Sequence, residues 1–182
     1  MGVVSWQSGV MVLMFNVNDY VMSFSSGVCR ITAVKTDAAG SDNMEYYVLS
    51  PVYQSNLTIM VPVRSADNLM RPILTREEVL TLIASMPDLE TIAVLDYRER
   101  TNMFKAALKT RDNNSLIKVI KTLYLEKQSK SSTNQKLTKP DEEIMNAAER
   151  QLNEEFAIAL QIAPEEVPSL ILSCIASQDE RA

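Results

Sequence analysis

The sequence predicts an α+β protein in which a small antiparallel β module precedes a compact all-helical domain. Short apolar segments separated by turn residues fill the first third of the chain, a pattern typical of strands. After about residue 75, apolar residues recur every three or four positions, as they do on the buried face of a helix. A polar stretch over residues 64–74 separates the two patterns. A length of 182 residues suits two small domains of this kind.

The β module is predicted to hold four or five short strands. In the segment 27–35, Cys29 and Ile31 share one face and Arg30 and Thr32 share the other, so one face is buried and one is wet. Pro62 cannot donate to a ladder, so the strand that contains it is expected to be an edge or to end there. So many short strands indicate a small barrel or a strongly curved sheet. The predicted strands are Val17–Phe24, Gly27–Lys35, Glu45–Leu49 and Leu57–Val63, with a turn over 36–44.

The helical domain is predicted from capping signals and apolar periodicity. Thr75 and Glu78 form a capping box ahead of a helix that ends near Pro87. Asp96 is the expected N-cap of a helix that continues to residue 109, and Asn113 or Asn114 is expected to open a long helix. Residues 128–139 have little apolar content and are expected to form a loop. Two further helices are predicted, one starting at Thr138-Lys139-Pro140-Asp141 and one over Glu165–Ala176.

These patterns divide the chain into five parts. Residues 1–13 are expected to be a flexible extension, and 177–182 a tail. The β module is placed at 14–66, a linker at 67–74 and the helical domain at 75–176.

The composition argues against an enzyme. The chain has no histidine, which removes Ser-His and Cys-His nucleophilic pairs and the usual zinc ligand sets. Its four glycines form no phosphate-binding loop, and Cys29 and Cys174 lack metal-site spacing. We therefore expect no catalytic site, no metal, no cofactor and no small-molecule substrate. No apolar run reaches the roughly 18 residues of a membrane span, so we expect no membrane association and a cytoplasmic location.

Charge is sorted along the helical half. Residues 97–139 carry eleven Lys/Arg and three Asp/Glu, whereas residues 140–182 carry two Lys/Arg and ten Asp/Glu. The whole chain has a net charge of −5. This pattern suggests either a basic surface for a polyanion or two solvated helix faces whose charges pair with each other.

Five segments stand out as an ordered set along the chain. They are Phe15-Asn16-Val17-Asn18-Asp19, Ser26-Gly27-Val28, Glu45-Tyr46-Tyr47-Val48-Leu49, Leu57-Thr58-Ile59-Met60-Val61-Pro62-Val63, and Asp96 to Asp112 with the long helix after it. Together they resemble the CarD/CdnL family of bacterial transcription regulators, and the front half is also similar to the RNA-polymerase-interacting domain of transcription-repair coupling factor. The similarity extends over residues 14–176, and residues 1–13 have no counterpart.

The resemblance implies a Tudor- or SH3-like front module that docks on the RNA polymerase β subunit by pairing strand edges, a mode called β-augmentation. It places the docking edge in the fourth predicted strand. The alternative is that this strand lies inside a barrel. The implied polymerase-binding residues are Asn56, Leu57, Thr58, Ile59, Met60 and Val61.

For the helical domain, the resemblance implies contact with promoter DNA, largely independent of sequence, and a more stable open complex. The family's tryptophan, which wedges into the distorted minor groove, falls on Tyr97. The alternatives are a Tyr97 ring packed on the core and basic side chains that are merely solvated. The Lys130–Lys139 loop is expected to be only a connector. The expected DNA-binding residues are Tyr97, Arg98, Arg100, Lys105, Lys109 and Arg111.

The sequence departs from the family pattern at three positions. Tyr97 replaces the wedge tryptophan, and Trp6 lies outside the similar region. Asn18 stands where many members have glycine, and Met60 stands where a basic residue is common. The first hypothesis is a monomeric polymerase-bound regulator that touches promoter DNA and stabilises, or at some promoters hinders, the open complex. The second is a polymerase-binding adaptor whose helical domain binds another protein and no DNA.

Overall fold

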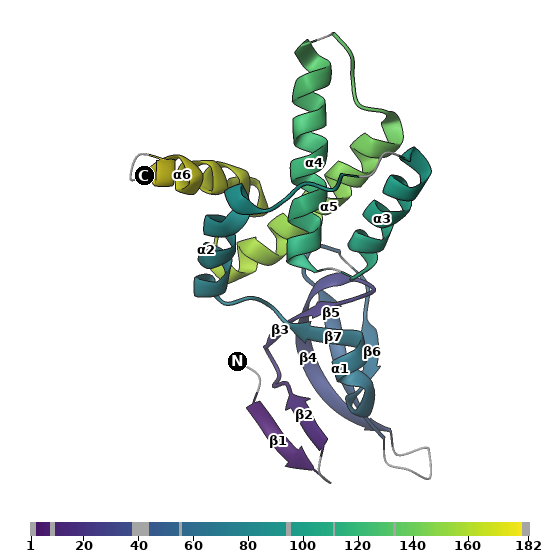
Figure 1. The fold of residues 1–182 in the computed structure, drawn as a ribbon. Coiled ribbons are helices and arrows are strands. Elements are labelled where there is room, and N and C mark those ends of the chain that lie inside the picture. Colours follow the sequence, from purple (N-terminus) through teal and green to yellow (C-terminus); the bar gives the residue numbers. More distant parts are fainter. Residues whose placement is uncertain are drawn as a thin grey trace. The chain divides into compact units, whose positions relative to one another are not determined.

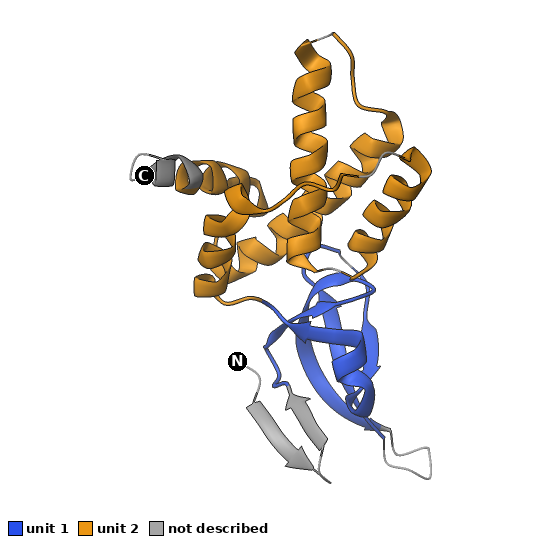
Figure 2. Ribbon diagram, in the orientation of Figure 1, with its two compact units in different colours: residues 1–73 blue, residues 74–182 orange. Residues whose placement is uncertain are grey.

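The protein consists of a strand-rich unit followed by a helical unit, as the sequence predicts. The computed structural model describes residues 3–7, 10–37, 44–54, 56–93, 96–110, 112–132 and 134–179. The chain divides into two compact units, residues 1–73 and residues 74–182 (Figure 2). Strands dominate the first unit and helices make up the second (Figure 1), which confirms the α+β class.

A five-stranded antiparallel sheet forms the first unit. The strand order is β6-β5-β4-β3-β7, so β6 and β7 are the two edges of an open sheet. The register between β4 and β5 shifts between Ile31 and Ala33, where the ladder is irregular. The strands are β3 (Tyr20–Ser23), β4 (Gly27–Asp37), β5 (Met44–Pro51), β6 (Ile59–Pro62) and β7 (Met70–Pro72).

One face of this sheet carries the core of the first unit. Phe15 and Tyr47 meet edge to face, with ring centroids 5.9 Å apart and an interplanar angle of 80°. The Tyr47 hydroxyl also accepts the backbone N–H of Phe15 at 3.2 Å, which ties the start of the module to β5. The buried side chains of this core are Phe15, Val21, Cys29, Ile31, Tyr47, Leu49, Val61, Ala66 and Met70.

Two turns require backbone conformations that only certain residues adopt easily. Gly27 has a φ of 79° where β3 turns back into β4. Asn18 has the same φ of 79°, and its side chain accepts a hydrogen bond from Arg30 Nη2 at 2.6 Å. Asp19 Oδ2 accepts the backbone N–H of Asn16 at 2.8 Å. This turn explains why the first core strand begins at Tyr20, three residues later than predicted.

The boundary of the β module lies further along the chain than predicted. Residues 67–74 were expected to form a linker, but Met70–Pro72 is β7, which pairs with β3. A short helix, α1 (Ala66–Leu69), precedes it, and both Ala66 and Met70 are buried in the core. The linker prediction is therefore wrong up to residue 73, because Ala66 and Met70 supply apolar surface that the sheet needs.

The N-terminal extension contains two paired strands that were not predicted from the sequence. The strands β1 (Val3–Gln7) and β2 (Val10–Met14) pair antiparallel as a separate two-stranded sheet. The predicted flexibility of residues 1–13 stays a prediction.

In the part of the second unit that the structure describes there are five α-helices, and four of them pack around the fifth. The central helix is α5, which packs against α2, α3, α4 and α6. The 3₁₀ turn Met86–Asp88 follows α2, and the 3₁₀ turn Pro164–Glu166 precedes α6. The helices are α2 (Arg76–Ser85), α3 (Tyr97–Thr110), α4 (Asn113–Ser132), α5 (Lys139–Leu160) and α6 (Val167–Asp179).

Most of the predicted helix caps are present. The Thr75 side chain accepts the Glu78 N–H, and Glu78 accepts the Thr75 N–H at 2.7 Å, which completes the capping box. Asp96 accepts the Glu99 N–H at 2.7 Å. The helix α4 begins at Asn113, as predicted, and the side chain that caps it is that of Asp112, which accepts the Ser115 N–H at 2.8 Å.

The long helix α4 also continues beyond its predicted end. The segment from residue 128 was expected to be a loop, but α4 runs to Ser132. Lys130 pairs with Glu126 at 2.7 Å, one turn earlier on the same helix. Side-chain pairing along the helix therefore offsets the low apolar content that suggested a loop.

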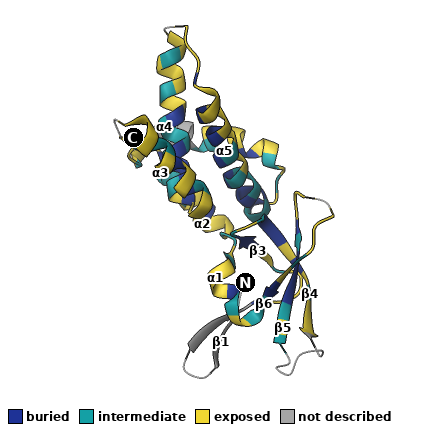
Figure 3. Cartoon of the chain, turned by 90° about the vertical axis from the view of Figure 1, so that its right-hand side faces the viewer, coloured by how far each residue is buried: buried dark blue, intermediate teal, exposed yellow. Residues whose placement is uncertain are grey.

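Two apolar clusters fill the helical unit. One lies among α2, α4, α5 and α6 around Phe156, and the other lies among α3, α4 and α5 around Phe104. Ile120 contacts both clusters. Figure 3 marks in dark blue the buried residues of the chain, which include stretches of α4 and α5.

Within the described residues, no single helix is long and apolar enough to cross a membrane. Residues 139–160 and 164–174 pass that test only as a pair, which is bent by 105°.

Candidate functional site

The strand β6 is an edge of the sheet, where the resemblance placed the polymerase-docking segment. It pairs with β5 from Leu49↔Ile59 to Tyr46↔Pro62, and no described strand pairs with its other side. Met60 is 54% exposed, whereas Val61 is buried in the core. Of the two positions considered for this strand, the edge of the sheet and the inside of a barrel, the structure shows the edge.

The first half of the predicted docking segment precedes the strand. Asn56, Leu57 and Thr58 lie outside β6, and all three are exposed. Asn56 has a φ of 68°, typical of a turn. The segment Asn56–Val61 is therefore a turn that leads into a short edge strand, and its exposed apolar side chains are Leu57 and Met60.

The exposed side of α3 carries a row of polar side chains. Phe104 and Ala107 are buried and fix which side of α3 faces the core. The positions of Arg98, Asn102, Lys105 and Lys109 follow the i, i+4, i+7, i+11 spacing of a single stripe on the opposite side. All four are exposed.

We call Arg98, Lys105 and Lys109 the cationic stripe. None of the three forms an ion pair with a described residue, so their charges face solvent. At a rise of 1.5 Å per residue, the stripe extends for about 16 Å.

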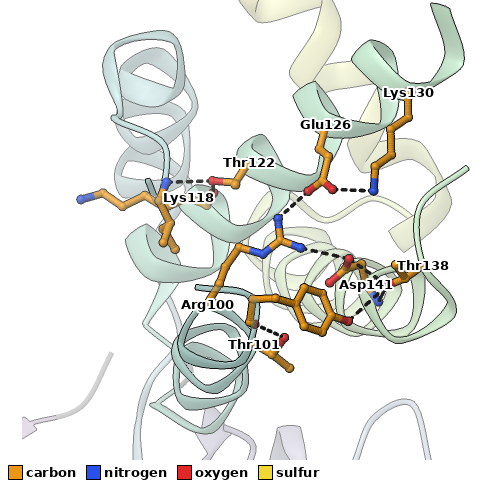
Figure 4. Close-up of polar contacts among 10 residues, drawn as sticks. Arg100, Thr101, Lys118, Thr122, Glu126, Lys130, Thr138 and Asp141 are labelled. Carbon is orange, nitrogen blue, oxygen red and sulfur yellow. Dashed lines mark hydrogen bonds and ion pairs between the residues drawn. The ribbon is translucent and has the colours of Figure 1, made fainter. Parts of the chain in front are cut away.

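Arg100 lies on the same helix but does not belong to the cationic stripe. Its Nη1 donates to Glu126 Oε2 at 2.6 Å, and its Nη2 donates to Asp141 Oδ2 at 3.0 Å (Figure 4). The Arg100 side chain is 14% exposed and that of Asp141 is fully buried. Arg100 thus joins α3, α4 and α5 through two charge-assisted hydrogen bonds.

The aromatic rings of Tyr97 and Phe104 flank this guanidinium group. Its central carbon lies 5.4 Å from the Tyr97 ring centroid and 5.3 Å from that of Phe104, within the range of cation–π attraction. Tyr97 remains 49% exposed. Its hydroxyl lies 3.4 Å from Thr138 Oγ1, which donates to Asp141 Oδ2 at 2.8 Å. Tyr97 is therefore an exposed ring supported from within the domain.

Glu126 forms two ion pairs on α4. Partial burial raises the pKa of the Glu126 carboxyl, but hydrogen bonds from Lys130 and Arg100 and the charges of both outweigh it. The net effect is a pKa below the ordinary value for glutamate. The carboxylate form is accordingly the form that the folded protein stabilises.

The structure thus groups some of the predicted DNA-binding residues and separates others. Arg98, Lys105 and Lys109 share one exposed side, and Tyr97 lies one residue before Arg98. Arg100 is held inside the domain, and Arg111 lies outside the described residues. In the predicted connector, Lys130 belongs to α4 and pairs with Glu126, while Lys136 and Lys139 are exposed.

Sequence reasoning missed the internal role of Asp141. The charge run at residues 141–143 predicted only a negative first helix turn, and Asp141 does lie in the first turn of α5. The available signal was the position of Arg100, four residues before the apolar Phe104, which places it on the buried side of α3. Among the described residues, no group of three or more His, Cys, Asp or Glu side chains could hold a metal ion.

Comparison with known proteins finds a similarity in the first unit. A family model described as the CarD-like/TRCF RID domain matches residues 15–74. This range agrees with the extended boundary of the β module, since it includes β7. No curated protein matches the chain. Residues 15–74 are therefore similar to the CarD-like/TRCF RID domain, and this similarity suggests a module that interacts with RNA polymerase.

Proposed function

We propose that this protein is a transcription regulator that binds the RNA polymerase β subunit through its β module and contacts promoter DNA through α3. The contact would modulate the stability of the open complex. One observation carries the proposal: a module similar to the CarD-like/TRCF RID domain is followed in the same chain by a helix that has an exposed cationic stripe and begins with an exposed tyrosine. We further propose that the protein acts as a cytoplasmic monomer without catalytic activity.

The β6 edge supports docking by β-augmentation. An edge strand leaves backbone N–H and C=O groups without a ladder partner, and these groups can pair with a strand of another protein. Leu57 and Met60 add exposed apolar surface to this edge. The opposite edge, β7, has only three residues and ends in Pro72, which offers no N–H donor.

The cationic stripe supports contact with DNA phosphates. Arg98, Lys105 and Lys109 occupy the exposed side of one helix, and none of them forms an ion pair with a described residue. Contacts of this kind fix position on the duplex without reading sequence. Tyr97 adds a partly exposed ring for stacking against an unstacked base step. Arg100 is left out of the proposed contact set because Glu126 and Asp141 neutralise it.

The adaptor hypothesis remains the second candidate, since it too has a supporting observation. Internal carboxylates engage Arg100, one of the five cations predicted to contact DNA, and the chain has a net charge of −5. In that case the helical unit would bind a protein and leave promoter DNA untouched.

The substitution Tyr97→Ala tests the DNA contact. We expect a shorter open-complex lifetime in a purified transcription assay, with unchanged binding to polymerase, because α3 is remote in sequence from β6. Tyr124→Ala is a matched control, because Tyr124 is 48% exposed on α4 and lies off the cationic stripe. Equal open-complex lifetimes for wild type, Tyr97→Ala and Tyr124→Ala would contradict the proposed contact between Tyr97 and DNA and would favour the adaptor hypothesis.

A further inference from the structure

Two carboxylates already bind Arg100, and its surroundings favour a role other than a contact with DNA phosphates. It lies three residues after Tyr97, on the side of α3 that faces α4 and α5. We infer that Arg100 is a positioning residue that holds the Tyr97 ring in its exposed orientation. This inference rests on the proposed contact between Tyr97 and promoter DNA.

Two ion pairs hold the guanidinium group of Arg100 in place, independently of its contact with the Tyr97 ring. Two carboxylates on different helices bind its two terminal nitrogens, at 2.6 Å to Glu126 and 3.0 Å to Asp141. A planar guanidinium can use its fork for such pairs and stack on a ring at the same time, which the point charge of lysine cannot do. The fully buried Phe104 ring lies 5.3 Å from the same group and limits its movement further.

The Tyr97 ring is then restrained at two points. The Arg100 guanidinium lies 5.4 Å from the ring centroid, and the hydroxyl lies near Thr138 Oγ1. Thr138 itself donates to Asp141, the same carboxylate that binds Arg100. Contacts through Asp141 therefore restrain both the body and the tip of the tyrosine side chain (Figure 4 shows Arg100, Thr138 and Asp141).

A ring restrained in this way loses little further freedom when it stacks against DNA. Side chains whose geometry is set in advance lose less rotamer entropy on binding than free ones. Tyrosine has a smaller ring than tryptophan, so part of its effect as a wedge would come from this support. Arg100 would then influence the open complex only through Tyr97.

The test must avoid leaving a buried charge unpaired. Arg100→Gln alone would leave the fully buried Asp141 carboxylate without its cationic partner, which is enough to destabilise the domain. The double variant Arg100→Gln/Asp141→Asn removes both charges and keeps side chains that can hydrogen-bond. Glu126 retains its partner Lys130 at 2.7 Å.

The first readout is the environment of the ring itself. The chain has six tyrosines, so a protein labelled with ¹³C-tyrosine gives few ring signals, and Tyr97→Phe assigns that of Tyr97. In the double variant we expect the Tyr97 signals to shift and the Tyr124 signals to stay in place. Unchanged Tyr97 signals would overturn the inference, whatever the effect on transcription.

The second readout is a double-mutant cycle on open-complex lifetime. We expect Arg100→Gln/Asp141→Asn to shorten the lifetime by up to about fivefold, as expected for the loss of one cation–π contact. In the Tyr97→Ala background the same two substitutions should have no further effect. Equal shortening in both backgrounds would show that Arg100 acts through the fold or on DNA directly, and would overturn the inference.

The two readouts separate this inference from the proposed function. If Tyr97→Ala leaves the lifetime unchanged, the proposed DNA contact of Tyr97 fails, and the ring signals alone decide whether Arg100 positions Tyr97. If Tyr97→Ala shortens the lifetime and the double variant does not, the DNA contact stands and the positioning role of Arg100 is refuted.

Discussion

The salt dependence of DNA binding should reveal how many cations on α3 meet phosphates. The perturbation is Lys105→Gln, which removes one charge from the middle of the cationic stripe without disturbing a buried side chain. The structure offers three exposed cations on this stripe, Arg98, Lys105 and Lys109. Each phosphate neutralised on a duplex contributes about −0.9 to the slope of log affinity against log salt concentration.

Three contacts give a slope of about −2.7, so affinity should fall about 40-fold between roughly 50 and 200 mM salt. Without Lys105 the slope should be about −1.8 and the fall about 12-fold. If Arg100 were a fourth contact, the wild-type fall would instead be about 150-fold. These differences are large enough to tell the three cases apart.

The assay is fluorescence anisotropy of a labelled promoter duplex, titrated with the full chain at several salt concentrations. Lys35→Gln is the control, because Lys35 is an exposed lysine on β4 of the other unit. The reasoning is refuted if Lys105→Gln leaves the slope unchanged. It is equally refuted if Arg100→Gln/Asp141→Asn lowers the slope as much as Lys105→Gln does.

Two further predictions concern stability. Thr75→Ala removes the side-chain half of the capping box and should lower the free energy of unfolding by about 1 kcal/mol, measured by urea denaturation; no change would mean that the cap is dispensable. The pKa of Glu126 is lowered in the folded protein, so its contribution to stability is present above the ordinary pKa near 4.5 and is lost as pH falls through the folded value. Wild type should therefore lose more stability than Glu126→Gln between about pH 6 and 3, and parallel stability curves would contradict the prediction.

The sequence predicts those features of this fold that depend on local patterns. The alternation along residues 27–35 correctly places Cys29 and Ile31 inside, because a strand shows its pattern regardless of its partners. The caps at Thr75 and Asp96 are likewise local, since each side chain bonds a backbone N–H three residues away. Such features need no knowledge of the rest of the chain.

The features that were missed depend on distant partners. The strand β7 has only three residues, too few to show an alternating pattern, and it exists because β3 pairs with it across nearly 50 residues of sequence. Arg100 looks like a surface cation until its two carboxylates, 26 and 41 residues away, are known. A charged residue on the buried side of a helix is a warning of such a partner, but spacing alone does not identify it.

The central claim is that the β6 edge binds RNA polymerase. The most direct test is the affinity of the purified full chain for purified polymerase, measured by biolayer interferometry with Met60→Asp and Val34→Asp. Both positions are exposed apolar residues of the same sheet, but Met60 lies on the edge strand β6, whereas Val34 lies on β4, where it pairs with Tyr47 of β5. A charge on the edge disfavours pairing with another strand. We predict tight binding by wild type and Val34→Asp and loss of binding by Met60→Asp. Full binding by Met60→Asp, or no binding by wild type, would contradict the claim.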